Sequence, residues 1–101
     1  AFVDMADEKK VTPLMRAAGN GDKMSAAVLL YYKANPNIGD SLGETPLMKA
    51  ARVGSLDVVK LLVESGADVG IQDNTGHTAL DYADYSRKRS VENFLREAEN
   101  R

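Results

Sequence analysis

The amino-acid sequence predicts an all-α solenoid made of stacked helix-turn-helix units, with β-turn or hairpin loops that project from the stack. The main observation is a short motif that recurs every 33 residues: Thr12-Pro13-Leu14, Thr45-Pro46-Leu47 and Thr78-Ala79-Leu80. Three aspartates ahead of these motifs keep the same spacing: Asp7, Asp40 and Asp73. A fixed period between about 20 and 50 residues is typical of repeat proteins, so the period indicates the architecture before any local pattern is considered.

The period divides the chain, which we expect to form a single domain over residues 1–101, into a short tail and three repeats. The tail, residues 1–6, aligns with the ends of the later repeats and corresponds to the end of a preceding or partial repeat. The repeats are predicted at 7–39, 40–72 and 73–101. This register is expected of an excised fragment, or of a domain with an abbreviated N-terminal edge.

Each repeat is predicted to contain an inner and an outer helix. The inner helix begins at a threonine, which is a good N-cap, and in two repeats a proline follows at the first helical position. In the second repeat we expect an inner helix over 45–54, then an outer helix capped by Ser55 and ended by a left-handed Gly66. Lys33 and Lys10 replace glycines at such positions, so we expect strain at Lys33 and a looser or differently shaped turn at Lys10.

The third repeat, 73–101, is predicted to be a C-terminal capping repeat. Apolar positions of the second repeat become polar in it, since Ala51 corresponds to Asp84 and Val59 to Glu92. A terminal repeat needs a polar outer face because no further repeat covers it. Three apolar residues are still expected to face the second repeat: Val91, Phe94 and Leu95.

The composition is typical of one small folded domain. Of the 101 residues 44% are hydrophobic and 28% are charged, and the net charge is −2. This charge argues against nucleic acid or an anionic membrane as a partner, since both favour a basic excess. The chain has no cysteine and no apolar run of membrane-spanning length, and it lacks a signal-like start. We therefore expect an intracellular protein, in the cytoplasm or the nucleus.

These repeated elements resemble the ankyrin repeat over essentially the whole chain. The residues that carry the resemblance are Asp40-x-x-Gly43-x-Thr45-Pro46-Leu47-x-x-Ala50-Ala51-x-x-Gly54, Val58-Val59-x-Leu61-Leu62 and Gly66-Ala67-Asp68-Val69. The resemblance implies stacked helix pairs whose turns and inner helices form a concave, partner-binding face. It also implies a protein that is not an enzyme.

The chain departs from this family at the residue after Thr-Pro-Leu, where ankyrin repeats commonly have a histidine that ties neighbouring repeats together. Here the three positions hold Met15, Met48 and Asp81, so we expect that hydrogen-bond network to be missing or replaced. For the two methionines, packing between repeats and an adaptable groove floor both remain open.

No residue pattern predicts catalysis: we expect no catalytic residue, no metal site and no cofactor. His77 is the only histidine and is expected in an exposed turn without a nucleophile beside it. The repeated Asp40 and Asp73 are explained by turn stabilisation. The basic Arg87-Lys88-Arg89 segment is interpreted as a solvated loop, with contact to nucleic acid or an acidic peptide as the alternative. Asn37 is expected to make a structural turn bond, and hydroxylation is the alternative that the resemblance suggests.

Partner-binding residues are predicted from the turn tips and the exposed ends of the inner helices. The candidates are Leu42, Glu44, Arg52, Val53, Asn74, Thr75, His77 and Tyr85. Among them Arg52 and Tyr85 are residue types favoured at binding hot spots, and Leu42 has no evident packing role in its turn. Packing on neighbouring repeats is the alternative for Leu42 and Val53.

The expected function is a non-enzymatic protein–protein interaction module that holds a peptide or a protein surface in the concave groove. We expect a monomer or a member of a hetero-complex. The alternative is a structural spacer or a targeting segment of a longer ankyrin-containing protein, possibly appended to an enzyme in the parent chain. The fold alone does not identify the partner.

Overall fold

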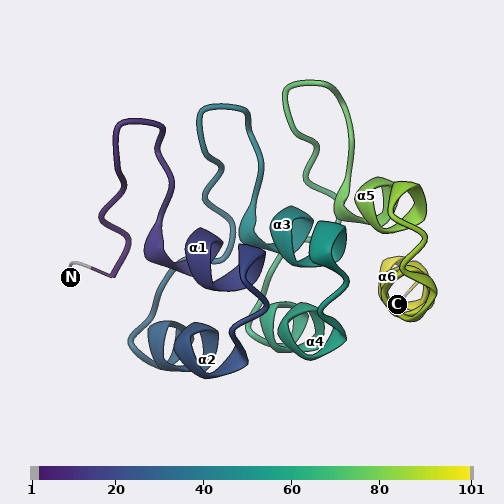
Figure 1. Ribbon diagram of the computed structural model, residues 1–101, viewed down its shortest axis with the longest axis horizontal. Helices are drawn as coiled ribbons and strands as arrows, with labels where there is room; N and C mark the ends of the chain where they lie inside the picture. Colours follow the sequence, from purple (N-terminus) through teal and green to yellow (C-terminus); the bar gives the residue numbers. More distant parts are fainter. Residues whose placement is uncertain (1–2, 101) are drawn as a thin grey trace.

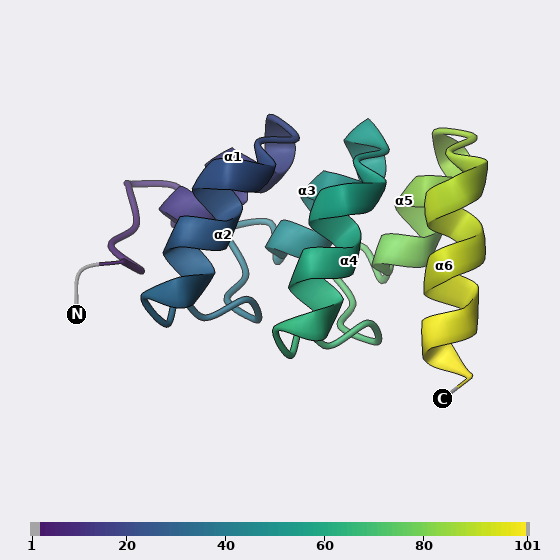
Figure 2. The same ribbon diagram turned by 90° about the horizontal axis from the view of Figure 1, so that it is seen from below.

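The computed structural model describes residues 3–100, and in this part of the chain all regular structure is α-helical. The helices are α1 (Pro13–Gly19), α2 (Lys23–Tyr31), α3 (Pro46–Val53), α4 (Leu56–Glu64), α5 (Ala79–Tyr85) and α6 (Arg89–Glu99). Figure 1 shows them as three pairs in a row, with a hairpin loop projecting from each pair to the same side. Figure 2 shows the outer helices α2, α4 and α6 side by side. The predicted all-α stack is confirmed.

The inner helices α1, α3 and α5 begin as the sequence predicts. Thr12, Thr45 and Thr78 are their N-caps, and each hydroxyl accepts a hydrogen bond from the amide three residues later. The prediction for the outer helix of the second repeat is only partly right. Helix α4 does start after Ser55, but the Ser55 hydroxyl makes no capping hydrogen bond, so the predicted side-chain cap is wrong.

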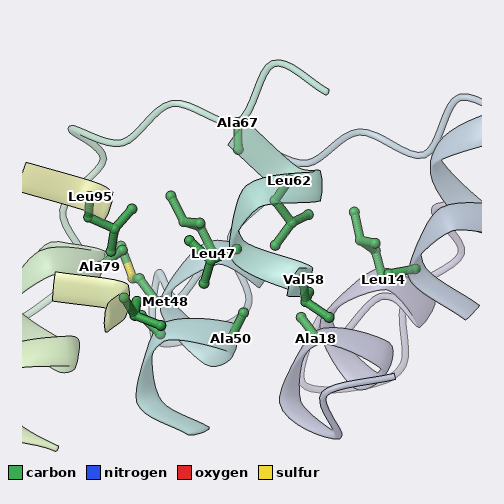
Figure 3. Packing of buried hydrophobic residues seen from close by; sticks show 14 of the residues in the cluster. Leu14, Ala18, Leu47, Met48, Ala50, Val58, Leu62, Ala67, Ala79 and Leu95 are labelled. Carbon is green, nitrogen blue, oxygen red and sulfur yellow. The ribbon is translucent and has the colours of Figure 1, made fainter. Parts of the chain in front are cut away.

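The core lies between neighbouring helix pairs. Alanines of the inner helices are fully buried there, including Ala18, Ala50 and Ala51, and their small side chains let the inner helices approach closely. Larger aliphatic side chains from both layers fill the remaining space, as Figure 3 shows for Leu14, Leu47 and others. A row of this kind is stabilised by contacts between neighbouring units, because one pair alone cannot bury its own apolar face.

Met15 and Met48 belong to this core. Their exposed fractions are 0% and 1%, so both side chains pack between repeats and neither forms a groove floor. The hydrogen bonds made at this repeat position stay within one repeat, so they do not rebuild the histidine network between repeats. The Met15 sulfur accepts a hydrogen bond from the Thr12 amide at 3.4 Å, and an Asp81 carboxylate oxygen accepts from the Thr78 amide at 2.9 Å.

Neighbouring repeats are instead joined by hydrogen bonds at both ends of the hairpin loops. At the tips, the Ser41 amide donates to the Lys9 carbonyl at 2.9 Å and the Asn74 amide donates to the Leu42 carbonyl at 3.0 Å. At the base, the Asn37 side chain accepts from the Asp68 amide at 2.7 Å and donates to the Gly66 carbonyl at 3.2 Å. Asn37 therefore has the structural role that the sequence favoured.

The last helix pair has both a packed apolar face and exposed polar faces. Helix α6 buries Val91 and Leu95 against the rest of the core, and Phe94 packs there partly. Its other faces are polar and include an i,i+4 ion pair between Arg96 and Glu92 at 3.6 Å. Such pairs add only a few tenths of a kcal/mol on an exposed helix, so their main effect is a wettable surface.

Three residues other than glycine adopt the left-handed conformation: Lys10 (φ 63°), Lys33 (φ 74°) and Arg87 (φ 57°), within the described part of the chain. Lys33 therefore carries the predicted strain. The expectation of a different turn at Lys10 is wrong. The Lys10 amide donates to the Asp7 carbonyl at 2.9 Å, as the Gly43 amide does to Asp40 at 2.8 Å, so the turn keeps its shape despite the strain.

Replacing Lys33 with glycine is expected to stabilise the protein by roughly 0.5 to 1 kcal/mol, because glycine adopts positive φ without the clash of a Cβ atom. The measurement is the free energy of unfolding from urea titration. Lys33→Ala is the matched control, since it removes the same side chain and keeps the Cβ. Equal stability of the two variants would show that the backbone at residue 33 is not strained.

Gly43 and Gly76 offer a matched pair for testing the contact between hairpin tips. Both have positive φ, 79° and 85°, so alanine costs roughly 1 kcal/mol of strain at either site. A Cβ on Gly43 would also lie 2.6 Å from the Asn74 side-chain oxygen, whereas a Cβ on Gly76 would meet nothing within 4 Å. Gly43→Ala should therefore destabilise the protein clearly more than Gly76→Ala in urea unfolding. Equal losses would mean that the tips can separate freely.

Candidate functional site

The hairpin loops are held against the inner helices by one aspartate per repeat. In the second repeat, one Asp40 carboxylate oxygen accepts the amides of Leu42 and Glu44, both at 2.9 Å. The other oxygen lies 3.0 Å from the Lys49 ammonium on helix α3. The same arrangement links Asp7 to Arg16 at 2.6 Å and Asp73 to the Tyr82 hydroxyl. The turn-stabilising role predicted for these aspartates is confirmed, and it fixes each loop relative to its helix.

Glu44 lies at the junction between the second hairpin and helix α3 and is only 8% exposed. Its carboxylate accepts hydrogen bonds from Lys49 at 3.2 Å and from Arg52 at 2.9 Å. These charge-assisted bonds orient the Arg52 guanidinium and offset part of its positive charge. Glu44 was predicted as a partner contact; the structure turns its carboxylate toward two cations of its own chain.

Arg52 extends from the second repeat onto the aromatic side chains of the third. Its guanidinium carbon lies 4.5 Å from the centre of the Tyr82 ring, a cation–π distance. The His77 ring lies 5.8 Å from both the Tyr82 ring and the Tyr85 ring, and its packing with Tyr85 is edge-on. We call Arg52, His77, Tyr82 and Tyr85 the Arg52–aromatic cluster. It spans two repeats on the side of the molecule formed by the hairpins and inner helices.

The cluster combines fixed groups with exposed ones. Tyr82 is half-buried, whereas Tyr85 is 75% exposed and the Arg52 side chain is 42% exposed. An exposed tyrosine ring and a guanidinium edge provide apolar area, hydrogen-bond donors and a positive charge in one place. This is a surface suited to contacting another molecule.

Asp73 anchors the third hairpin beneath this cluster. Burial by itself would raise the pKa of Asp73, but hydrogen bonds from the Tyr82 and Thr75 hydroxyls and from the His77 and Thr75 amides outweigh it. The net pKa of Asp73 therefore lies well below the usual value of an aspartate. The Thr75 hydroxyl also lies 2.7 Å from the His77 ring nitrogen Nδ1, which helps to orient that ring.

The structure brings together five of the eight predicted binding residues around Asp73 and Tyr82: Glu44, Arg52, Thr75, His77 and Tyr85. The other three lie elsewhere on the same repeats. Leu42 and Asn74 lie at the hairpin tips, where the Asn74 side chain donates to the Ser41 carbonyl at 3.1 Å. Val53 is the last residue of α3. Leu42 and Val53 are 60% and 45% exposed, so packing does not explain either side chain.

Sequence reasoning missed Tyr82. It occupies the position of Arg16 and Lys49 in the earlier repeats, and it precedes Tyr85 by three residues on the same helix. Residues three apart share a helix face, so this spacing was the available signal. The interaction with Arg52 could not be read from it, because the two residues belong to different repeats.

Within residues 3–100, no three His, Cys, Asp or Glu side chains lie close enough together to hold a metal ion. The same part of the chain contains no helix with the length and apolar character needed to cross a membrane.

Asp73 should make stability depend on pH in acid. Because its pKa is lowered in the folded state, its contribution is complete above the unfolded value of about 4 and is lost as the pH falls further. Asp40 acts in the same direction, since its pKa is also lowered. Tyr82→Phe removes the largest hydrogen bond to Asp73, so we expect it to lose less stability than wild type between pH 5 and about 2.

Urea unfolding at several pH values measures this difference. Tyr85→Phe is the control, because it removes a hydroxyl from the same helix without touching Asp73. If Tyr82→Phe and wild type lost stability equally on acidification, the Tyr82 bond would not be what lowers the pKa of Asp73.

The chain was also compared with known proteins. No curated protein matches it. The family model described as "Ankyrin repeats (3 copies)" matches residues 14–100, which includes all three helix pairs except the first residue of α1. The repeated motif, the row of helix pairs and this match agree, and the chain belongs to the ankyrin-repeat family.

Proposed function

We propose that this chain is a protein–protein interaction module that binds a peptide or a protein surface through its hairpin-side face, which the ankyrin fold makes concave. Ankyrin repeats are generally protein–protein interaction modules, and the family is typically non-enzymatic. We extend both properties to this chain. We also propose that it acts inside the cell, as a monomer or within a hetero-complex, without contacting nucleic acid or membrane.

The observation that carries this proposal is the exposed Tyr85 ring in the cluster that also contains Arg52. Tyr85 is 75% exposed, yet it is packed edge-on against His77. A ring that is already oriented loses little conformational freedom when a partner covers it, so more of the contact energy contributes to affinity. Tyrosine and arginine are also the residue types that most often dominate binding energies.

The cluster favours a partner with two adjoining features. An apolar side chain would pack on Tyr85, and an acidic or hydrogen-bond-accepting group would meet the exposed edge of Arg52. Glu44 offsets part of the Arg52 charge, so recognition there rests on the planar donor edge as well as on charge. Leu42 at the hairpin tip offers a second apolar contact. Val53, Asn74 and Thr75 are further proposed contacts: Val53 directly follows Arg52 in the sequence, and Asn74 and Thr75 shortly precede His77.

A second candidate function is that of a structural spacer or targeting segment within a longer ankyrin-containing protein. The observation in its favour lies away from the cluster. Helix α2, at one end of the row, carries Met24 and Val28 with exposed fractions of 77% and 53%. Exposed apolar side chains at the end of a stack are suited to further stacking.

The first proposal predicts that Tyr85→Ala weakens partner binding by about tenfold or more, the effect of losing a hot-spot residue. Tyr31→Ala is a matched control. Tyr31 is 78% exposed and also packs edge-on against a tyrosine, but it lies on the outer helix α2. The three proteins are used to capture partners from cell lysate, and the affinity of a partner held by wild type is then measured by calorimetry.

A partner held by the Tyr31 variant and lost by the Tyr85 variant would support the hairpin-side face. Equal retention by both variants would move the site away from this face, and loss by the Tyr31 variant alone would place it on the outer helices. Arg52→Gln is a suitable second variant. Arg52→Glu is less informative, because it would place a second carboxylate against the buried Glu44 and disturb the fold.

A further inference from the structure

The end of the row formed by α1 and α2 has an open cleft of about 550 Å³ between the two helices. All of its lining residues come from this first helix pair and the turn within it. Most of the lining surface is apolar and includes Pro13, Ala17, Met24, Val28 and Leu29. The cleft is separate from the Arg52–aromatic cluster, which lies on the second and third repeats.

The second helix pair shows what such a face looks like when a neighbour covers it. Pro46 corresponds to Pro13 and Leu62 to Leu29, and both are fully buried in the second repeat but half-buried in the first. Val28 is 53% exposed, whereas Leu61 at the same position of α4 is half-buried. The helix pair α1–α2 provides this cover for the second repeat. The equivalent face of α1–α2 is apolar in the same places and has no cover within residues 3–100.

The segment ahead of the first hairpin already follows the repeat pattern. A carboxylate oxygen of Asp4 accepts a hydrogen bond from the Asn35 amide at 2.9 Å. One repeat later, the side-chain oxygen of Asn37 accepts from the Asp68 amide at 2.7 Å. Asp4 thus makes the contact that the end of one repeat makes with the next. A helix pair that directly preceded this segment in a chain would therefore be placed against the cleft with the same repeat spacing.

The opposite end of the row is a poor match for the cleft. Asp84 and Glu92 stand where the second repeat has the fully buried Ala51 and Val59. If a second copy of the chain stacked end to end, these carboxylates would be placed at the mainly apolar cleft. Glu92 is paired with Arg96, but burying charged groups against an apolar surface is costly even for a pair, so this occupant is disfavoured.

We propose that the α1–α2 end is an interaction surface for a further helix pair of the same repeat geometry, which enters through residues 3–6. Its inner helix brings small side chains against Pro13 and Ala17, and its outer helix brings aliphatic side chains against Val28 and Leu29. This occupant continues the interface between the first and second repeats.

The experiment adds such a pair in register. Residues 40–66 are duplicated directly ahead of residue 1, so that residue 1 takes the place of residue 67 and the period of 33 is kept. We expect a single unfolding transition whose midpoint is higher by roughly 5 to 10 °C. The urea dependence should also be steeper, because the cooperative unit is larger.

Two valine substitutions in the duplicated protein test the location. Val28→Asp places a charge in the cleft and should remove the gain. Val53→Asp is the matched control, with a valine of similar exposure on α3, 45% against 53%, and it should leave the gain intact. Ser25→Lys is a second cleft variant in case Val28→Asp disturbs the 101-residue chain itself, because Ser25 is exposed in this chain whereas its counterpart Val58 is fully buried in the covered second repeat.

Several results would overturn the proposal. They are a separate transition for the added pair, a gain that survives both cleft substitutions, or a gain that Val53→Asp also removes. Sedimentation of the 101-residue chain tests the remaining occupant. A dimer that Val28→Asp dissociates and Val53→Asp does not would make a second copy the occupant and would also overturn the proposal.

Discussion

The whole hairpin side of this protein depends on a carboxylate that is shared between a turn and a helix. One oxygen of Asp7, Asp40 or Asp73 accepts two backbone amides, which closes the turn. The other oxygen is bound by a side chain nine residues later on the inner helix. Because the chain is anchored at both oxygens, each loop keeps one orientation, and three loops stand in line as one surface (Figure 1). Without this anchor the loops would be joined mainly at their tips.

The inner-helix side chain that binds the turn aspartate differs between the repeats: it is Arg16 in the first, Lys49 in the second and Tyr82 in the third. The surface beside each hairpin therefore differs as well. In the third repeat the partner is aromatic, so its ring can receive Arg52 from the second repeat while its hydroxyl binds Asp73. The residues that hold the third hairpin thus also hold the Arg52–aromatic cluster. Tyr85 extends beyond them into solvent, which leaves it available for a partner without a structural role of its own beyond its contact with His77.

The two ends of the row differ in a way that follows from nearest-neighbour packing. Each pair is stabilised by the pairs beside it, so the face of a terminal pair needs either polar residues or a cover. Helix α6 has polar residues at its surface, with Glu92 and Arg96 where α4 has Val59 and Val63. Helices α1 and α2 keep an apolar face, and the segment ahead of them already makes the contact of a preceding repeat through Asp4. The two ends of the row therefore present surfaces of different character, one polar and one apolar.

The sequence by itself determined the period, the starts of the inner helices and the left-handed Gly66, because each depends on a residue and its close neighbours along the chain. Threonine caps, the turn aspartates and Gly66 act locally, and repetition at 33 residues strengthened each assignment. Three of the four residues of the Arg52–aromatic cluster were also predicted, since Arg52, His77 and Tyr85 lie on positions that face outward. The tertiary structure decided the rest. The burial of Glu44, the role of Tyr82 and the fate of Met15 and Met48 depend on side chains in a neighbouring helix or repeat. Which partner a flexible side chain selects is set by packing in three dimensions, and a single sequence contains no local signal for that choice.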